Sequence, residues 1–438
     1  MVPSVRYPLH QRRLDNGLRV VINPDPAVPA VAVNLWYDVG SRHEEPGRSG
    51  FAHLFEHLMF QGSAHVGSGK HISMLQAAGA SVNATTWFDR TNYFEALPVG
   101  GLDLALWLEA DRLSTLLEAV TQENLDNQRE VVKEEKRQRY DNVPYGLMMQ
   151  FLVQNTFPAD HPYGHTTIGS MEDLDAAELA DVHAFFRRHY MPNNAVLTIA
   201  GGIEVDDAMT RVERYFGQIP AGELPETPKT PPLPALSGVP RTEVRAPVPA
   251  DALYLSWRLP ALDQRSFDAA DLGLSILGDG QTSRLYRRLV REDQLTTGAG
   301  ASALGLIGGN SFGFASARAR ESVDIAQVEE IMISEIERFA AEGPTDEELL
   351  RAKAQYERQW LSALATLATR ADQISSAATL LDDPEEINQR LITIDGIDTA
   401  EITAAVAEHL TADARAAVVY RAIGEDDPVT VTSERLPS

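Results

Sequence analysis

Residues 51–60 read Phe-Ala-His-Leu-Phe-Glu-His-Leu-Met-Phe, an apolar decamer that carries two histidines and one glutamate. The segment contains no glycine or proline, and its apolar residues predict a buried helix. On a helix, His53 and His57 lie one turn apart on one face, about 6 Å along the axis. Glu56 adjoins the same face. Burying three such polar groups without a metal ion is costly, so the decamer predicts a metal site rather than an ordinary helix face.

The arrangement fits zinc-dependent hydrolysis. A bound zinc ion lowers the pKa of its water and polarises the scissile carbonyl, while a carboxylate that is not a ligand takes and returns the proton. His-x-x-Glu-His is the inverted relative of His-Glu-x-x-His and marks the inverzincins. The chain has no cysteine, so histidines and carboxylates must hold any transition metal. We therefore expect one zinc ion per chain, with Glu56 as the general base.

Two histidines do not complete a catalytic zinc site, which needs a third protein ligand and an open position. An acidic helix expected over residues 121–139 offers four candidate carboxylates: Glu123, Glu130, Glu134 and Glu135. Spacing alone does not choose among them, and an acidic helix is more often a solvated face. Glu134 is favoured because Val131 and Val132 indicate that this turn packs inward.

A proline-rich segment over residues 219–249 divides the chain into halves of about equal size. Proline restricts the backbone and removes hydrogen-bond donors, so this segment is expected to be an extended spacer. The expected organisation is a metal-binding domain at 1–220, a linker at 221–249 and a second domain at 250–438.

The two halves resemble each other in sequence. Phe51 and Phe267 each open a helix after an apolar strand, and the block 121–125 matches the block 345–349. The offset between matched positions drifts from 216 to 224, as expected for a duplication with small insertions. In the second copy, Thr345 and Glu348 form a capping box that should open its long helix.

Each half mixes strands with consecutive helices, which favours an α+β fold over a parallel βαβ sheet. In the first half, the expected strands are residues 18–23, 31–37, 80–84, 92–97 and 195–200. The expected helices are residues 101–118, 121–139, 145–157, 173–189 and 205–216.

The net charge is −25, from 63 acidic and 38 basic residues, which argues against nucleic acid as a partner. It would attract basic peptides and metal cations, although solubility alone also explains it. No stretch approaches the ~18 apolar residues of a membrane span. The N-terminus lacks the apolar core of a signal peptide. The protein is expected to be soluble, and a removed export signal would leave the choice between cytoplasm and periplasm open.

The sequence resembles the pitrilysin/insulinase family of zinc peptidases, in particular its two-domain, mitochondrial-processing-peptidase-like branch. The His-x-x-Glu-His helix is followed, 76 intervening residues after His57, by Glu134. Further motifs carry the resemblance: Leu14-Asp15-Asn16-Gly17-Leu18, Gly40-Ser41-Arg42-x-Glu44, Asn83-Ala84-Thr85-Thr86, Thr91-x-Tyr93, His161-Pro162-Tyr163-Gly164 and Tyr190-x-Pro192-Asn193-Asn194-Ala195. The resemblance implies His53, His57 and Glu134 as zinc ligands and Glu56 as the base. It also implies two domains, each an antiparallel sheet with helices packed on it, that face each other across a chamber.

The second half departs from the metal-binding pattern. Residues 267–273 contain no histidine, and Arg358 stands at the position that corresponds to Glu134. This half is therefore expected to shape the chamber and hold substrate. Active relatives supply an arginine and a tyrosine there, and Arg284 matches the arginine, with a plain surface cation as the alternative. Thr297 stands where the tyrosine is expected. Asn127 replaces a glutamate of some relatives, so support for the third ligand is expected to be weaker.

The strand around residues 80–84 has an expected role in binding. In relatives, the substrate peptide adds to a sheet edge beside the metal, which demands little of the peptide's sequence. Asn83 and Ala84 are then substrate-binding residues, and an ordinary internal strand is the alternative.

These observations predict a zinc metalloendopeptidase that cleaves peptides or unfolded segments in a closed chamber. The missing tyrosine at position 297 favours a catalytic subunit paired with a homologous subunit that supplies an Arg/Tyr pair, with a homodimer as the fallback. The alternative is a non-catalytic core-type subunit of a larger complex.

Overall fold

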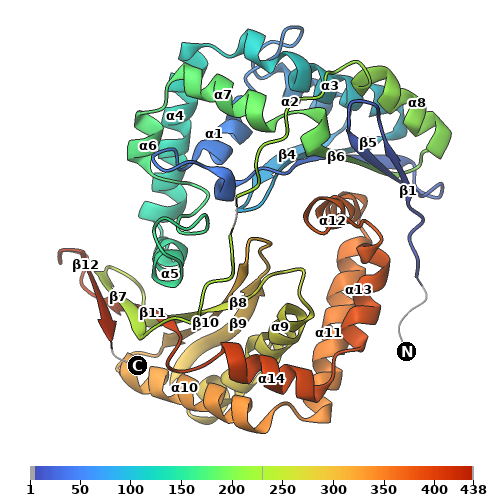
Figure 1. The fold of residues 1–438 in the computed structure, drawn as a ribbon. Helices are drawn as coiled ribbons and strands as arrows, with labels where there is room; N and C mark the ends of the chain where they lie inside the picture. Colours follow the sequence, from blue (N-terminus) through green and yellow to red (C-terminus); the bar gives the residue numbers. More distant parts are fainter. Residues whose placement is uncertain (1–4, 229, 437–438) are drawn as a thin grey trace. The chain divides into compact units, whose positions relative to one another are not determined.

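The computed structural model describes residues 5–228 and 230–436, which contain two six-stranded sheets with helices packed on them (Figure 1). The α+β fold expected from the sequence is confirmed. In each sheet one neighbouring pair is parallel, β2 with β6 and β7 with β11, and the other pairs are antiparallel. The sheets are therefore mixed, which corrects the expectation of antiparallel sheets.

The first sheet has the order β1-β2-β6-β3-β5-β4. Its strands are β1 (His10–Arg13), β2 (Arg19–Pro24), β3 (Ala30–Tyr37), β4 (Ser81–Thr86), β5 (Thr91–Pro98) and β6 (Ala195–Gly201). The second sheet has the order β12-β7-β11-β8-β10-β9. Its strands are β7 (Val239–Ala246), β8 (Ala252–Pro260), β9 (Thr296–Leu304), β10 (Asn310–Ala319), β11 (Ala416–Ala422) and β12 (Thr430–Leu436). From the second strand to the last, the two orders correspond, so the fold confirms the internal duplication.

The helices of the first half are α1 (Phe51–Leu58), α2 (Lys70–Ala77), α3 (Leu102–Ala119), α4 (Gln122–Lys136), α5 (Met148–Thr156), α6 (Met171–Asp175), α7 (Leu179–His189) and α8 (Val205–Phe216). Those of the second half are α9 (Arg265–Gly278), α10 (Ile325–Glu342), α11 (Asp346–Leu364), α12 (Leu367–Leu380), α13 (Glu386–Asp395) and α14 (Thr399–His409). The predicted capping box opens α11, because the Thr345 amide donates to Glu348 and the Glu348 amide to Thr345 Oγ1, at 3.0 and 3.2 Å.

The chain divides into two compact units that exchange segments between the sequence halves. The first unit comprises residues up to Glu134, Thr167–Pro228 and Arg358–Ile392, and the second comprises the remaining residues. Unit 1 thus takes α12 from the second half, while unit 2 takes α5 from the first. The spatial units differ in this way from the consecutive domains 1–220 and 250–438.

The exchanged helices each cover one face of a sheet. In unit 1, α12 packs on β3 and β6 through an apolar cluster that includes Trp36, Val196 and Ile374. In unit 2, Asn155 on α5 donates to Thr242 and to the Ala417 carbonyl, at 3.0 and 3.1 Å. Neither sheet would keep this face covered by its own sequence half alone.

Strand β7 lies inside the segment expected to be a linker. It is hydrogen-bonded on both sides, to β11 and to β12, and four of its eight residues are buried, among them Val239 and Val244. Outside β7, the described residues of 221–249 contain no helix or strand. The many prolines predicted an extended spacer here. The strand forms nevertheless, because its hydrogen-bond partners β11 and β12 come from the distant end of the chain.

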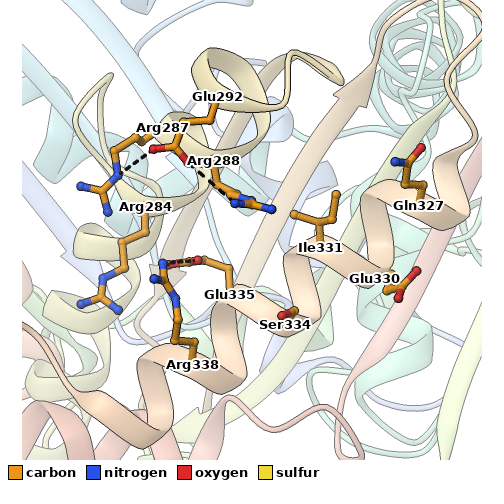
Figure 2. Close-up of a pocket in the computed structure, with 10 residues that line it drawn as sticks. All are labelled: Arg284, Arg287, Arg288, Glu292, Gln327, Glu330, Ile331, Ser334, Glu335 and Arg338. Carbon is orange, nitrogen blue, oxygen red and sulfur yellow. Dashed lines mark hydrogen bonds and ion pairs between the residues drawn. The ribbon is translucent and has the colours of Figure 1, made fainter.

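Unit 2 contains an open cavity of about 700 Å³ between the helical turn Tyr286–Glu292 and α10 (Figure 2). Four arginines line it together with acidic and small polar side chains: Arg284, Arg287, Arg288 and Arg338. Arg338 pairs with Glu335 at 2.5 Å, and Arg287 and Arg288 each lie 3.9 Å from Glu292. In the described residues, no helix is both long and apolar enough to cross a bilayer.

Candidate metal centre

Helix α1 begins at a left-handed glycine and is capped by a glutamate of the preceding loop. Gly50, at its N-cap, has φ +91°, a left-handed conformation that favours glycine. The Glu44 carboxylate accepts hydrogen bonds from the amides of Gly50 and Ala52, at 2.9 and 2.7 Å. These amides have no acceptor within the helix, so Glu44 caps it from the preceding loop. The Gly40-to-Glu44 motif of the sequence therefore anchors the start of α1.

One side of α1 is buried and the other carries the site. The Phe55 ring stacks on Phe185 of α7, with centroids 5.0 Å apart, and Leu54 and Leu58 are fully buried. This packing leaves three half-buried side chains together on the other side of the helix: His53, Glu56 and His57.

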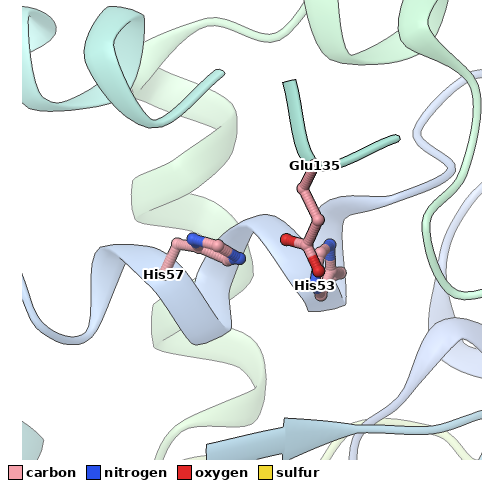
Figure 3. Close-up of side chains that lie close together, drawn as sticks. All are labelled: His53, His57 and Glu135. Carbon is pink, nitrogen blue, oxygen red and sulfur yellow. The ribbon is translucent and has the colours of Figure 1, made fainter. Parts of the chain in front are cut away.

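Three side chains with metal-binding atoms converge at this site. The rings of His53 and His57 lie 4.9 Å apart and are nearly perpendicular. Glu135, near the end of α4, extends toward them (Figure 3), and one ligand atom from each residue lies within 4.8 Å of the others. Helix α4 is continuous, and the boundary between the two units falls within its last turns. In the described residues this is the one such group of three.

Glu135, rather than the expected Glu134, is the carboxylate that lies beside the two histidines in this structure. Residues three apart share a helix face, so Glu134 follows Val131 and Glu135 follows Val132. Val132 is fully buried, but Val131 is 41% exposed. Glu134 accordingly lies on the exposed side of α4, while Glu135 is half-buried. Glu134 as the third ligand stays a prediction, and Glu135 is a second candidate for that role.

The other carboxylates of α4 lie away from the histidines. Glu123 and Glu130 are exposed, and so is Asn127, at which weaker support for the ligand was expected. Two helical turns before Glu135 stands Gln128, which is 6% exposed.

Glu56 is held by the neighbouring sheet. The Thr86 hydroxyl, at the end of β4, donates a hydrogen bond of 2.6 Å to Glu56 Oε2. Arg90 lies near the same carboxylate. Burial lowers the pKa of Arg90 to about 10, against the opposing attraction of Asp372 and Glu56. Arg90 nevertheless stays cationic at neutral pH.

Strand β4 is the last strand of its sheet and pairs with β5 alone. Of the two alternatives left open by the sequence, an edge strand is therefore correct. Helix α1 packs on β4, so this edge lies beside the metal-binding helix. Asn83 is exposed and Ala84 is buried. Their contact with substrate stays a prediction.

Arg284 has a buried carboxylate as its partner. It is 5% exposed, and its guanidinium donates two hydrogen bonds to Glu348, at 2.9 and 2.7 Å, and one to the Gly343 carbonyl. It also lies over the Phe339 ring, 4.3 Å from the centroid. The alternative of a plain surface cation is wrong, and the expected substrate contact would require Arg284 to leave Glu348. Thr297, on β9, is exposed.

The donor set of the site fits zinc. Two imidazoles and one carboxylate are a known ligand set of catalytic zinc and leave a fourth position open. Ligand atoms of a tetrahedral zinc site lie roughly 3.3 Å apart for bonds of about 2.0 Å. Atoms within 4.8 Å of one another on flexible side chains reach that arrangement with small rotations.

Family models match both halves of the chain. Residues 19–170 match the model described as "Insulinase (Peptidase family M16)", and residues 176–356 match "Peptidase M16 inactive domain". The chain belongs to peptidase family M16. Within this family, the first match contains His53, His57 and Glu135, whereas the inactive-domain match contains α9 and most of α11. The His-x-x-Glu-His motif thus lies in the first match, and the copy without it lies in the second.

Proteins with similar sequences carry the name zinc protease. Zinc protease PqqE of Helicobacter pylori is 32% identical over 65% of this chain and 64% of its own length. An uncharacterized zinc protease of Mycobacterium tuberculosis is 28% identical over 93% of this chain and 92% of its own. The chain is thus similar to zinc proteases over nearly its whole length.

Solved structures share the fold. A protease from Helicobacter pylori has a TM-score of 0.88 at 24% identity, covering 95% of this chain and 99% of that one. The periplasmic protease PqqL from Escherichia coli has a TM-score of 0.75 at 20% identity. That match covers 96% of this chain but 49% of PqqL, so this chain spans about half of that protein.

Proposed function

We propose that this M16 family member is a zinc-dependent endopeptidase that cleaves extended peptides or unfolded segments. The observation that carries the proposal is that ligand atoms of His53, His57 and Glu135 lie within 4.8 Å of one another. Glu56 directly precedes His57 on the same helix. Zinc, when bound, supplies a water of lowered pKa and polarises the scissile carbonyl. The names of the zinc protease relatives support the same chemistry.

The residues of this chain have separate tasks in the proposed reaction. Glu56 would take a proton at a carboxylate oxygen from the attacking water, whose oxygen bonds to the scissile carbonyl carbon, and would return that proton to the leaving amide nitrogen as the C–N bond breaks. Strand β4 presents an unpaired edge, and a substrate peptide would pair with it through backbone hydrogen bonds. Asn83 and Ala84 lie in that strand. Binding of this kind would select an extended backbone more than a side-chain sequence.

A homologous partner subunit completes the proposal. Thr297 has a short side chain where active relatives carry tyrosine, and Arg284 is already paired with Glu348. The second half of this chain thus offers neither group readily to a substrate. We propose a heterodimer whose other subunit supplies an Arg/Tyr pair around a closed chamber, with a homodimer as the fallback. The complete set of zinc ligands and base disfavours a non-catalytic core-type subunit.

Zinc analysis combined with peptide digestion tests this function. The purified chain should contain about one zinc per chain, and Glu56→Gln should keep the metal but lose cleavage. Digestion is then repeated with homologous subunits from the same source and with Thr297→Tyr. Zinc-loaded protein that cleaves no peptide under any of these conditions would contradict the proposed activity. Full cleavage by the isolated chain, with no gain from any partner, would contradict the heterodimer.

A further inference from the structure

Strand β4 points its last two side chains to opposite faces of the sheet. In the antiparallel register, Thr85 pairs with Asn92 and Thr86 pairs with Thr91. Neighbouring residues on a strand alternate between faces. Thr86 therefore faces helix α1, where its hydroxyl donates to Glu56 Oε2 at 2.6 Å. Thr85 faces α12 on the other side.

The hydrogen bond has the length of a strong interaction. A hydroxyl that donates to a carboxylate forms a bond of about 2.5–2.7 Å, roughly twice as strong as a neutral one. Both side chains are half-buried, so solvent competes only partly for the bond. A glutamate side chain has three rotatable bonds, and this contact fixes its end.

A separate polar network lies on the other face of the sheet, around Thr85. The Thr85 hydroxyl donates to Asn92 Oδ1 at 2.6 Å, and Arg90 donates to both the Thr85 carbonyl and Asn92 Oδ1, at 2.9 and 3.0 Å. Asn92 in turn donates to Asp372 on α12, at 3.0 Å. This network ties the end of the edge strand to α12 and lies on the face of the sheet opposite the Thr86 hydroxyl.

Asp372 is the shared acceptor of that network. Its Oδ1 accepts hydrogen bonds from Trp36, Asn34 and Asn92, at 3.0, 3.2 and 3.0 Å. All three donors are nearly fully buried. A buried acceptor with several donors gives a rigid arrangement, because any displacement would leave a polar group without its partner.

We propose that Thr86 is a positioning residue for the general base of the proposed peptidase. The two oxygens of Glu56 then have different tasks: Oε2 is held by the Thr86 hydroxyl, and Oε1 exchanges the proton. The inference rests on the proposed function for its effect on rate, but not for its effect on the orientation of Glu56.

The test compares variants of Thr86 with a matched control on the opposite face. Thr86→Val keeps the shape of the side chain and removes the donor, and Thr86→Ser keeps the donor. Thr85→Val makes the same change one residue earlier, where the hydroxyl faces α12. Loss of a side chain that orients a functional residue without touching the reacting atoms typically lowers activity by roughly 10–100-fold. We expect that fall in kcat for Thr86→Val, with KM and zinc affinity within about twofold of the parent because binding is not affected.

The controls separate positioning from a loosened strand. Thr86→Ser should recover most of the kcat, and Thr85→Val should keep it while lowering the melting temperature. Added to Glu56→Gln, Thr86→Val should cause no further loss, because it acts through Glu56. If Thr85→Val reproduced the fall in kcat, or Thr86→Val kept the parental value, the proposal would be wrong. Thr86→Ala serves as the donor-free variant if Thr86→Val does not fold.

A crystal structure of metal-free Thr86→Val provides the readout that does not depend on activity. The Glu56 carboxylate should leave the position that it occupies beside β4, while β4 and α1 stay in place. An unchanged Glu56 carboxylate would overturn the proposal. Parent protein that binds zinc but cleaves nothing would count against the proposed function alone, because the orientation of Glu56 would still be decided by this structure.

Discussion

Helices α1 and α9 occupy equivalent places in the two copies but differ in what surrounds them. At the sequence offset of 216, His53, Glu56 and His57 correspond to Ala269, Leu272 and Gly273. The first three side chains are half-buried, whereas their counterparts are buried. At this place the second copy therefore has packed helices where the first has polar side chains. The same fold can therefore have accessible polar side chains or closely packed apolar side chains at this place, depending on whether a neighbouring helix covers it.

The surroundings of Gly273 show why α9 has no room for a larger side chain at this position. A Cβ atom added there would lie 2.7 Å from Val406 and 3.5 Å from Ile402, both on α14. Helix α14 therefore packs against α9 at the place where α1 carries His57. An imidazole in the second copy would lack room as well as companion ligands.

The largest expected effect comes from Glu56, the proposed base, whose counterpart in the second copy is Leu272. Glu56→Gln keeps the size of the side chain but cannot accept a proton. General acid–base catalysis contributes about 10²–10⁴-fold, so peptide cleavage should fall by that factor while zinc stays bound. Cleavage rates and zinc content of the same preparations check this. A variant that cleaves at close to the parental rate would remove Glu56 from the mechanism.

The next effect concerns the buried ion pair of the second copy. Removing one partner of a buried pair typically costs about 3–5 kcal/mol, so Arg284→Ala should destabilise unit 2 by that amount. The matched control is Arg287→Ala, whose side chain is 49% exposed and which should change stability by less than about 1 kcal/mol. Urea denaturation of both variants measures the difference. Equal midpoints for the two would show that Arg284 does not stabilise the fold.

The same pair predicts a pH dependence. Although burial opposes it, hydrogen bonds from Arg284 and Thr345 lower the pKa of Glu348 from 4.5 to about 2. The unfolded chain therefore binds a proton at a higher pH than the folded chain does. This stabilisation is complete above pH 4.5 and is lost as the pH falls from there toward 2, in total about 3 kcal/mol. Glu348→Gln should show a smaller loss of unfolding free energy over this pH range, and a loss as steep as the parent's would contradict the assignment.

A smaller effect sharpens the comparison of the two helices. Alanine in place of glycine within a helix usually stabilises by about 1 kcal/mol. Gly273→Ala should instead destabilise by roughly 1–3 kcal/mol, because its Cβ would overlap Val406. Gly100→Ala is the control, since an added Cβ there meets nothing within 4 Å. Denaturation midpoints decide the sign, and stabilisation by Gly273→Ala would mean that α14 does not close this place.

Local patterns were sufficient for some parts of the molecule. The decamer at 51–60 predicted α1 and its polar face, and the helix at 205–216 was predicted with the bounds of α8. The capping box at Thr345 and Glu348 also formed as predicted. Each of these features depends on residues within a few positions of one another, so the sequence pattern contains the whole cause.

Features that depend on distant partners were missed. Strand β7 needs β11 and β12, and the exchange of α5 and α12 needs the opposite sequence half. Arg284 pairs with the carboxylate of Glu348, which lies 64 positions further along the chain. The spacing did not choose between Glu134 and Glu135 as the third ligand, because that choice depends on which valine of α4 faces inward, and the packing around the helix decides this.

The central claim is that Glu135 joins His53 and His57 around one metal ion, and neighbouring glutamates on one helix test it most directly. Zinc content and zinc affinity are measured for Glu135→Gln and Glu134→Gln, two identical changes at adjacent positions. Loss of one of three protein ligands should strip the zinc from Glu135→Gln, while Glu134→Gln should keep about one zinc per chain. Stoichiometric, tightly bound zinc in Glu135→Gln, or its loss from Glu134→Gln, would contradict the account.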